Sequence, residues 1–217
     1  MKNSGFTLAE LLITLGVIGV VAALTFPMVL SKYNEVVYMN KLKRHVAFLE
    51  RMLQNIQNET GSISDTYALC HSLPAGGDNM SKCFINQMIQ FGGLNPNMVK
   101  YQAKWGIGPH AFRLLFPDSS YIAVQIINTA YVVYLFDLNG EKGPNLGGID
   151  RFAIHYYPYV KNYGNAVYKT LIHDLVPLKA QNRANIIAQC KNHGDQACIQ
   201  LLLDNNFKLP KDYPLKF

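Results

Sequence analysis

The first apolar stretch of the chain is long and almost free of charge. It covers 21 residues, from Phe6 to Phe26, and Glu10 is the one charged residue in it. As an α-helix it would extend roughly 31 Å, close to the hydrocarbon thickness of a bilayer. A core helix of a soluble domain would show a polar face, and this stretch has almost none. The pattern therefore predicts a membrane-spanning helix over residues 6–26.

A second, amphipathic pattern follows over residues 27–58. Pro27 lacks a backbone N–H and clashes with the preceding turn, so it either ends or kinks the helix. Beyond it, apolar residues recur at spacings of three or four: Val36, Met39, Leu42, Val46, Leu49, Leu53 and Ile56. This periodicity predicts a helix with one face to bury. The run Gly61-Ser62-Ile63-Ser64-Asp65 then ends it.

From residue 111 onward the pattern changes to that of strands. Residues 111–116, 121–127 and 130–136 are rich in β-branched and aromatic side chains. The intervening segments, Pro117–Ser120 and Asn128-Thr129, are typical hairpin turns. Shorter helices are predicted over 81–90, 182–190 and 196–205. A long helix packed on an antiparallel meander is an α+β fold.

Charge and size add modest constraints. The formal net charge of +6 becomes +5 if Lys2 is removed, which permits contact with DNA or anionic lipid without requiring it. The local basic cluster, Lys41, Lys43, Arg44 and His45, is interpreted as a solvated helix face, with lipid or DNA contact as the alternative. The 217 residues suffice for the N-terminal helix and one globular domain.

Three interpretations compete for the N-terminal segment. A secretory signal has a shorter apolar region and a small-residue cleavage site. Here the run is longer, and Ala22-Ala23 is followed by Thr25-Phe26-Pro27. A plain signal anchor fits the length but gives no role to Glu10. The third interpretation is a prepilin.

The stretch Gly5-Phe6-Thr7-Leu8-Ala9-Glu10 resembles the processing site of type IV pilins and of type II secretion pseudopilins. The resemblance implies that a prepilin peptidase cuts between Gly5 and Phe6 and N-methylates Phe6. It also implies that the helix is retained, first as a membrane anchor and then as the core of a filament. It favours a kink at Pro27 within a longer helix rather than an end.

This resemblance implies a pilin-like organisation of the whole chain. The expected parts are a leader at 1–5, a membrane or filament-core helix at 6–26, its amphipathic continuation at 27–58 and an exported domain at 59–217. The expected partners are homologous subunits, the prepilin peptidase, an inner-membrane assembly platform and membrane lipid. The expected location is the bacterial inner membrane, followed by a cell-surface or periplasmic filament.

Glu10 receives a specific role in this setting. An ionised side chain at the centre of a membrane helix costs about 2.5–3.5 kcal/mol, and less near the interface. Glu10 lies near the interface and near the positive end of the helix dipole. In a helix bundle it could neutralise the amine of Phe6 from a neighbouring subunit and fix the stagger between the two. The alternative is a Glu tolerated because it reaches the headgroups.

Four cysteines lie in the segment expected to be exported, as two local pairs. In an oxidising compartment, proximity favours Cys70–Cys83 and Cys190–Cys198 among the three possible connectivities. The alternative is a metal site using Cys190, His193 and Cys198. The C-x₂₋₄-C spacing of structural zinc sites is absent from the sequence.

The segment 137–150 combines turn residues with oxygen-bearing side chains. Asp137, Asn139, Asn145 and Asp150 could supply oxygen ligands to calcium, helped by backbone carbonyls. However, the match to an EF-hand loop is weak, because the glycine comes too early and Lys142 would repel a cation. Some pseudopilins carry calcium in a comparable loop, so the resemblance keeps calcium open. The other interpretation is a structural loop that presents subunit contacts.

The sequence carries no catalytic motif with a mechanism. Nucleophile elbows, zinc-protease helices, phosphate loops and dinucleotide fingerprints are absent, and the histidines are scattered. We therefore expect a structural filament subunit, a pseudopilin or minor pilin, and not an enzyme. The alternatives are a competence-type pilin that binds DNA and an exported binding protein held by a signal anchor.

Overall fold

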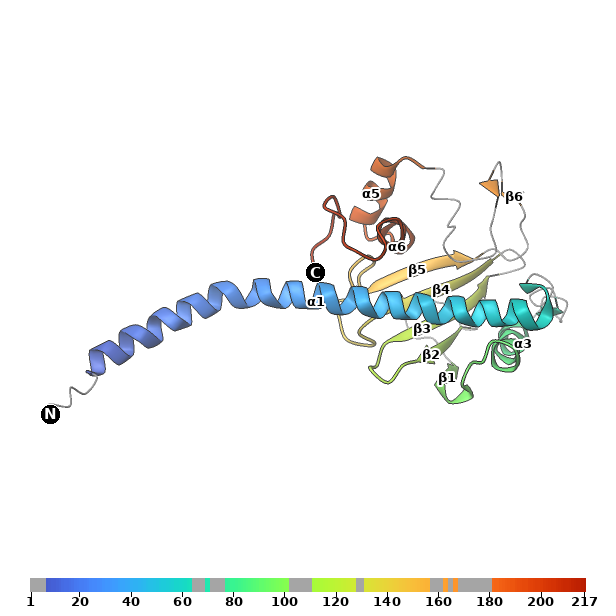
Figure 1. Ribbon diagram of the computed structural model, residues 1–217, viewed down its shortest axis with the longest axis horizontal. Helices are drawn as coiled ribbons and strands as arrows, with labels where there is room; N and C mark the ends of the chain where they lie inside the picture. The colour runs from blue at the N-terminus through green and yellow to red at the C-terminus, as the bar shows by residue number, and fades with distance from the viewer. Residues whose placement is uncertain are drawn as a thin grey trace. The chain divides into compact units, whose positions relative to one another are not determined.

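The computed structural model describes residues 7–63, 69–70, 77–101, 111–127, 131–156, 162–163, 166–167 and 181–217. The chain forms two compact units, residues 38–215 and residues 1–37 with 216–217. Helix α1, Leu8–Thr60, contributes to both and continues through Pro27 (Figure 1). The predicted leader and the Gly5-Phe6 bond lie outside the described residues.

The second half of α1 supplies a stripe of core residues to the larger unit. The buried positions recur every three or four residues: Met39, Leu42, His45, Val46, Leu49, Met52, Leu53 and Ile56. All but one of the predicted apolar positions belong to it. The exception is Val36, which is 50% exposed because the compact unit begins only at Tyr38. The helix ends at Thr60, where Gly61 takes a positive φ of 76°.

Five antiparallel strands form a meander in the order β1-β2-β3-β4-β5. Their bounds are β1 Val99–Tyr101, β2 Phe112–Leu115, β3 Tyr121–Ile127, β4 Tyr131–Asp137 and β5 Arg151–Tyr156. Three of them confirm the strands predicted at 111–136, and the Pro117–Ser120 turn is closed by the Phe116 N–H donating to Ser120 O. The predicted Asn128-Thr129 turn lies outside the described residues.

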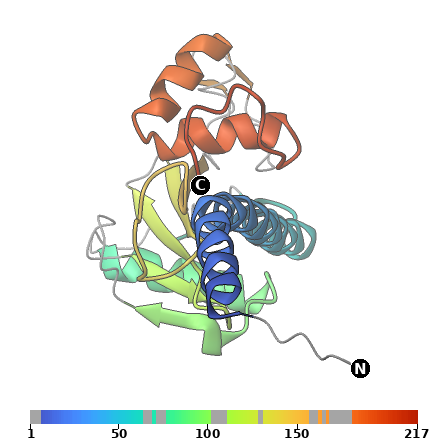
Figure 2. The ribbon, with the colours of Figure 1, turned by 90° about the vertical axis from the view of Figure 1, so that its left-hand side faces the viewer.

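One face of this sheet packs against the second half of α1. The His45 ring stacks on Phe116 with centroids 4.2 Å apart, and Phe48 meets the same ring edge-on at 5.4 Å. His45 also stacks on Phe136, which pairs with Ile122 and Phe152 on the same face. The helix crosses the sheet in Figures 1 and 2. The predicted α+β, pilin-like fold is thus confirmed.

Shorter elements complete the larger unit. They are α3 Gly77–Gln90, the 3₁₀ turn η1 Pro96–Met98, a two-stranded sheet of β6 Asn162–Tyr163 and β7 Ala166–Val167, α5 Arg183–Lys191 and α6 Asp195–Asp204. The predicted C-terminal helices are confirmed within one residue at each end. Asn182 caps α5 by accepting the Asn185 N–H at 2.9 Å. Helix α6 lies along β5, and its buried face includes Ile199 and Leu202.

Candidate functional site

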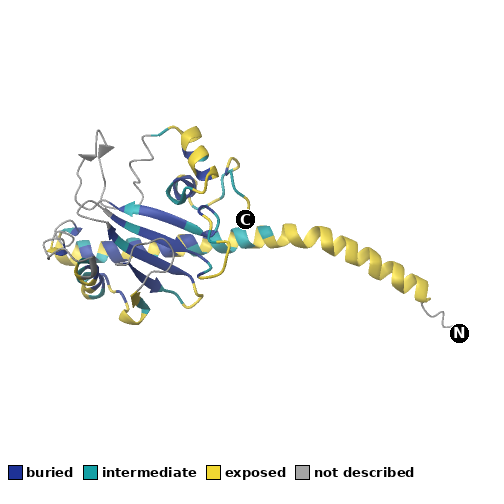
Figure 3. Cartoon of the chain, turned by 180° about the vertical axis from the view of Figure 1, so that it is seen from behind, coloured by how far each residue is buried: buried dark blue, intermediate teal, exposed yellow. Residues whose placement is uncertain are grey.

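The first half of α1 exposes an apolar surface along its length. Large apolar side chains from Leu8 to Leu30 are 43–78% exposed, and the yellow part of the helix in Figure 3 shows the same. The helix is long and apolar enough to cross a membrane. Apolar surface of this extent is stable only against lipid or other apolar helices.

Glu10 and Thr7 form a reciprocal cap at the start of this helix. The Thr7 backbone N–H and hydroxyl both donate to Glu10 Oε2 at 2.8 Å. In return, the Glu10 N–H donates to Thr7 Oγ1 at 3.3 Å. This is a capping box, recognisable in sequence as Thr-x-x-Glu. The prediction for Glu10 rested only on its charge and missed this spacing. The capping box gives Glu10 hydrogen bonds with Thr7 at the start of its own helix.

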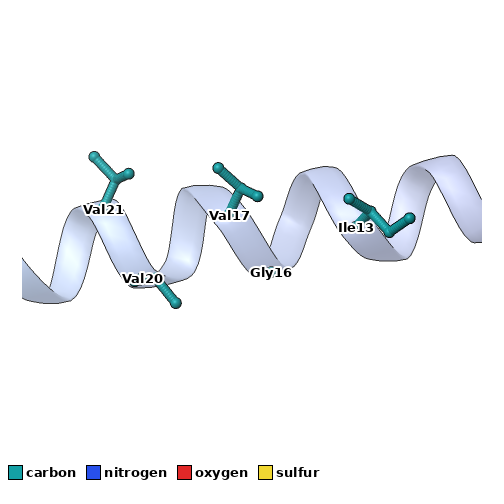
Figure 4. A pocket seen from close by; sticks show the side chains of 5 residues that line it. All are labelled: Ile13, Gly16, Val17, Val20 and Val21. Carbon is teal, nitrogen blue, oxygen red and sulfur yellow. The ribbon is translucent and has the colours of Figure 1, made fainter.

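A shallow apolar notch marks one side of the same helix (Figure 4). Ile13, Val17 and Val21 follow one ridge, and Gly16 and Val20 line the next. A Cβ built on Gly16 would meet no described atom within 4 Å. A larger residue at Gly16 is therefore compatible with this helix by itself, and any restriction on its size must come from a neighbouring molecule.

The two predicted disulfides are confirmed. Cys70 and Cys83 are bonded with Cα atoms 5.4 Å apart, and Cys190 and Cys198 with Cα atoms 4.7 Å apart. The second bond joins α5 to α6. Because both of its sulfurs are in the disulfide, the alternative of a thiolate metal site with His193 is wrong.

The loop between β4 and β5 is organised by two buried aspartates. Asp150 Oδ1 accepts the Leu146 N–H at 2.7 Å, and Asp150 Oδ2 accepts the Asn145 N–H at 2.8 Å. Asp150 Oδ2 also accepts from Asn139 Nδ2 at 2.9 Å. At the start of the loop, Asp137 Oδ1 accepts the Gly140 N–H at 2.7 Å. The structure thus gathers Asp137, Asn139 and Asp150, while Asn145 contributes its backbone N–H.

Calcium would need more oxygen ligands than these bonds leave. The ion takes about six to eight oxygens. Within the loop as described, the buried side-chain oxygens without a hydrogen-bond partner are Asp137 Oδ2 and Asn139 Oδ1. The described residues contain no cluster of three or more His, Cys, Asp or Glu side chains placed to hold a metal. The arrangement fits a loop held by its own hydrogen bonds, and calcium stays a prediction.

Burial perturbs the ionisation of Asp137. Its side chain is 1% exposed, and removal from water raises the pKa of its carboxyl to about 6. The neighbouring Tyr121 side chain and the Gly140 N–H, which donates to Oδ1, lower the pKa but only partly offset burial. The ionised carboxylate therefore lowers the stability of the folded protein at neutral pH. It also accepts the Gly140 N–H and so fixes the turn after β4.

The far end of the loop packs tightly on the C-terminal helices. A Cβ on Gly148 would come within 2.3 Å of Cys198 Sγ, and the residue has a φ of 80°. Its carbonyl accepts the Tyr213 hydroxyl at 2.5 Å. The neighbouring Gly147 carbonyl lies 2.9 Å from His193 Nδ1. Glycine is therefore required at Gly148 both by conformation and by close approach.

The basic cluster on α1 pairs within the domain. Arg44 Nη2 lies 2.6 Å from Asp118 Oδ2, Lys41 Nζ lies 3.5 Å from the same oxygen, and His45 is fully buried. Burial opposes ionisation of Asp118, but hydrogen bonds from Ser120 and Arg44 hold its pKa well below its usual range. The interpretation as a solvated face is confirmed for Lys43 and Arg44, which are exposed. It is wrong for His45, which is buried between the helix and the sheet.

His45 is held neutral beneath this cluster. Burial and the nearby Arg44 charge lower the pKa of its imidazole to about 3. Its Nε2 lies 3.0 Å from Ser120 Oγ, and the Ser120 hydroxyl donates to Asp118 Oδ1. Because the Ser120 hydroxyl proton is donated to Asp118, the Ser120 oxygen acts as acceptor toward His45. The imidazole therefore carries its proton on Nε2 and donates it to Ser120 Oγ. The arrangement is a buried contact between helix and sheet, not an exposed base.

Comparison with known families identifies the class of protein. Residues 1–26 match the family described as the prokaryotic N-terminal methylation motif. With the long helix on an antiparallel sheet, this makes the chain a prepilin-type, pilin-like protein. Residues 96–217 match the family described as a family of unknown function, DUF6613, and the chain belongs to that family. No curated protein and no solved structure matches the chain.

The methylation motif carries general implications. A prepilin-type motif implies processing by a peptidase and assembly with other pilin subunits. The motif and the long apolar helix fit a single-pass anchor in the inner membrane.

Proposed function

We propose that the chain is a structural subunit, a pseudopilin or minor pilin, of a type IV pilus or type II secretion-like filament. The peptidase cuts between Gly5 and Phe6 and methylates the new amine of Phe6. The subunit then leaves the membrane through an inner-membrane platform and joins a helical fibre. Its role is structural rather than catalytic. The match of residues 1–26 to the methylation motif is the observation that carries this proposal.

Glu10 is the proposed register point between subunits. Both hydrogen bonds from Thr7 go to Glu10 Oε2. In the proposed filament, Oε1 accepts a hydrogen bond from the Phe6 amine of a neighbouring subunit. In this pair, the carboxylate and the amine neutralise each other, so neither charge remains unpaired in apolar surroundings. The pairing favours assembly and fixes the axial stagger between subunits. Gly16 and the valine ridge beside it supply the close helix contact.

The mature N-terminus provides the direct test. Mass spectrometry of the chain isolated from its own host should find an N-methylated Phe6. An intact Met1, or cleavage near Ala23, would support the signal-anchor or secretory alternatives and overturn the proposal.

Assembly is tested separately with Glu10. Glu10→Val should be inserted into the membrane and processed as usual but reach sheared filaments at least about tenfold less, since the unpaired amine is left in apolar surroundings. Glu59→Gln, an exposed position on the same helix, is the matched control and should assemble normally. Normal assembly of Glu10→Val would refute the register role.

The competence-type alternative predicts a different result. DNA binding that weakens steeply with salt would favour it, because phosphate contacts release counterions. The ion pairs of Lys41 and Arg44 with Asp118 give that alternative no support.

A further inference from the structure

The uncharged part of α1 is bounded by one charge at each end. Glu10 precedes it, and Lys32 is the next charged residue, so residues 11–31 carry no charge. At about 1.5 Å per residue this stretch extends roughly 31 Å, which matches the hydrocarbon thickness of a bilayer, about 30 Å. When Glu10 lies at one interface of the membrane, Lys32 therefore lies at the other.

Residues 216 and 217 join α1 at this second boundary. The Ser31 hydroxyl donates a hydrogen bond to the backbone oxygen of Phe217. Lys216 and Phe217 also belong to the same compact unit as residues 1–37. Because consecutive Cα atoms lie about 3.8 Å apart, the contact places Lys216 near the level of Lys32. Two lysines that are distant in sequence thus share one level of the helix.

Both lysines are accessible to a ligand. The Lys32 side chain is 69% exposed, and Lys216 is exposed. Lys32 Nζ lies 2.6 Å from Glu35 Oε1, and this bond uses one of the three donors of the ammonium group. Long lysine side chains can keep their methylene groups on apolar surface while the charged end stays in a polar layer. Two lysines and one glutamate leave this level with a net positive charge.

Tyr33 and the turn before Ser31 give the segment the character of a membrane interface. Tyr33 is 65% exposed, and Met28 and Val29 are 76% and 62% exposed. Tyrosine is enriched at the level of lipid headgroups, because its ring is apolar and its hydroxyl is polar. An exposed tyrosine, an exposed apolar turn and two cations are the combination expected where a helix leaves a bilayer.

We propose that Lys32, Tyr33 and Lys216 form a collar that binds the headgroup phosphate of an anionic phospholipid, with phosphatidylglycerol as the probe. Such a collar presupposes the membrane-anchor stage of the proposed function and adds lipid choice to it. The two ammonium groups donate to the phosphodiester oxygens, while Met28 and Val29 contact the acyl chains. Phosphatidylcholine carries a cation of its own beside the phosphate, so the lysines attract it less.

The test uses the full chain purified in detergent micelles and native mass spectrometry. Phosphatidylglycerol and phosphatidylcholine with identical acyl chains are added in equal amounts, and the ratio of the two bound lipids is measured. The ratio should favour phosphatidylglycerol and fall as the ammonium acetate concentration rises, because salt screens surface charges. Inorganic phosphate at matched ionic strength should not remove the preference, since it has no acyl chains to contact the apolar turn.

Substitutions of single charges assign the preference to the collar. Lys32→Gln and Lys216→Gln should each lower the phosphatidylglycerol ratio by up to about fivefold. Glu35→Gln removes the competing acid and should raise the ratio by a similar factor. Lys43→Gln is the matched control and should leave the ratio unchanged, because Lys43 is exposed on the same helix but lies about three turns beyond Lys32.

The possible results separate cleanly. A ratio that falls in both collar-lysine variants and rises in Glu35→Gln supports the proposal. Equal retention of the two lipids, an unchanged ratio in either of those lysine variants, an equal fall in Lys43→Gln, or loss of the preference in inorganic phosphate would each overturn it.

Flotation with phosphatidylcholine vesicles distinguishes a failure of the collar from a failure of the proposed function. The wild type and every variant should float, because the apolar part of α1 is unchanged. A chain that floats without preferring phosphatidylglycerol refutes the collar alone. A chain that does not float refutes the membrane anchor together with the collar.

Discussion

At the scale of single residues, three polar groups in unusual positions have identifiable hydrogen-bond or packing partners. Asp150 holds a loop through backbone N–H groups, His45 lies neutral between helix and sheet, and Glu10 is capped by Thr7. In the sequence, Asp150 was a candidate calcium ligand, His45 belonged to a basic cluster and Glu10 was the one charge in an apolar run. What each group contacts decides whether it stabilises the domain or serves assembly.

Gly148 should tolerate no side chain. Gly148→Ala combines a φ of 80° with a Cβ 2.3 Å from Cys198 Sγ, so we expect a loss of about 2–4 kcal/mol in the free energy of unfolding. Gly143→Ala in the same loop meets no described atom within 4 Å and is the control. Urea denaturation measures both. An equal, small effect of the two substitutions would contradict the close packing.

Asp137 should make stability depend on pH. Its pKa is 3.8 in the unfolded chain and about 6 when folded, so the folded state binds the extra proton between those values. Stability from this group is therefore present below pH 4, falls as pH rises to 6 and stays reduced above it. Asp137→Asn should stabilise the protein at pH 7 by at most about 3 kcal/mol and have little effect at pH 3.5.

Urea denaturation at the two pH values measures this difference, with Glu59→Gln as a surface control. Asparagine keeps an oxygen for the Gly140 N–H, so the turn itself should survive. A stabilisation equal at both pH values would show that ionisation is not its cause.

At the scale of elements, the 137–150 loop joins two parts of the domain. Its first turn is built on Asp137 and its last on Gly148, which contacts the Cys190–Cys198 disulfide region through Cys198. The glycine-rich pattern predicted a turn-rich loop, and that interpretation is confirmed. The pattern could not show which donors the aspartates receive, because those depend on the folded path of the backbone.

The same loop should fold without calcium. Asp150 already accepts three hydrogen bonds inside it. We therefore expect the melting temperature of the purified chain to agree within about 2 °C between EDTA and millimolar calcium. A specific ion at 100 times its Kd would add about 2.7 kcal/mol and raise the melting temperature by several degrees. Such a rise, lost in Asp150→Asn, would instead establish the calcium site.

At the scale of the whole molecule, the two halves of α1 have different surroundings. Apolar side chains before residue 31 are exposed, whereas the buried core residues of α1 begin at Met39. One continuous helix thus combines a surface for lipid or neighbouring helices with a stripe for a domain core.

The larger unit should fold without the first half of the helix. A chain starting at residue 31 should be soluble without detergent and unfold in one cooperative transition. Its melting temperature should lie within about 5 °C of the full chain, because residues 1–30 contribute no side chain to the described core. A chain starting at residue 48 is the contrast and should not fold, since it lacks Met39, Leu42, His45 and Val46. Aggregation of the longer chain would contradict this division.

The sequence by itself determined the class of the protein and most of its elements. Long-range apolar periodicity, the Gly5-Phe6 motif and local turn residues are properties of neighbouring positions, so α1, β2–β4, α5 and α6 could be predicted. Strand β5 was missed although Phe152, Ile154 and Tyr156 alternate, because its polar flanks resemble a loop. The disulfide pairs followed from proximity along the chain.

Only the tertiary structure decided how distant residues share a site. Asp118 meets Arg44 across 74 positions, and Arg113 meets Tyr121 and Glu141 where a strand, a hairpin and a loop converge. Such contacts depend on strand register and on how the helix lies across the sheet, which local patterns do not specify. The helix that anchors the protein could therefore be identified from its residues alone. The contacts of Asp118 and Arg113 exist because folding brings separate segments together.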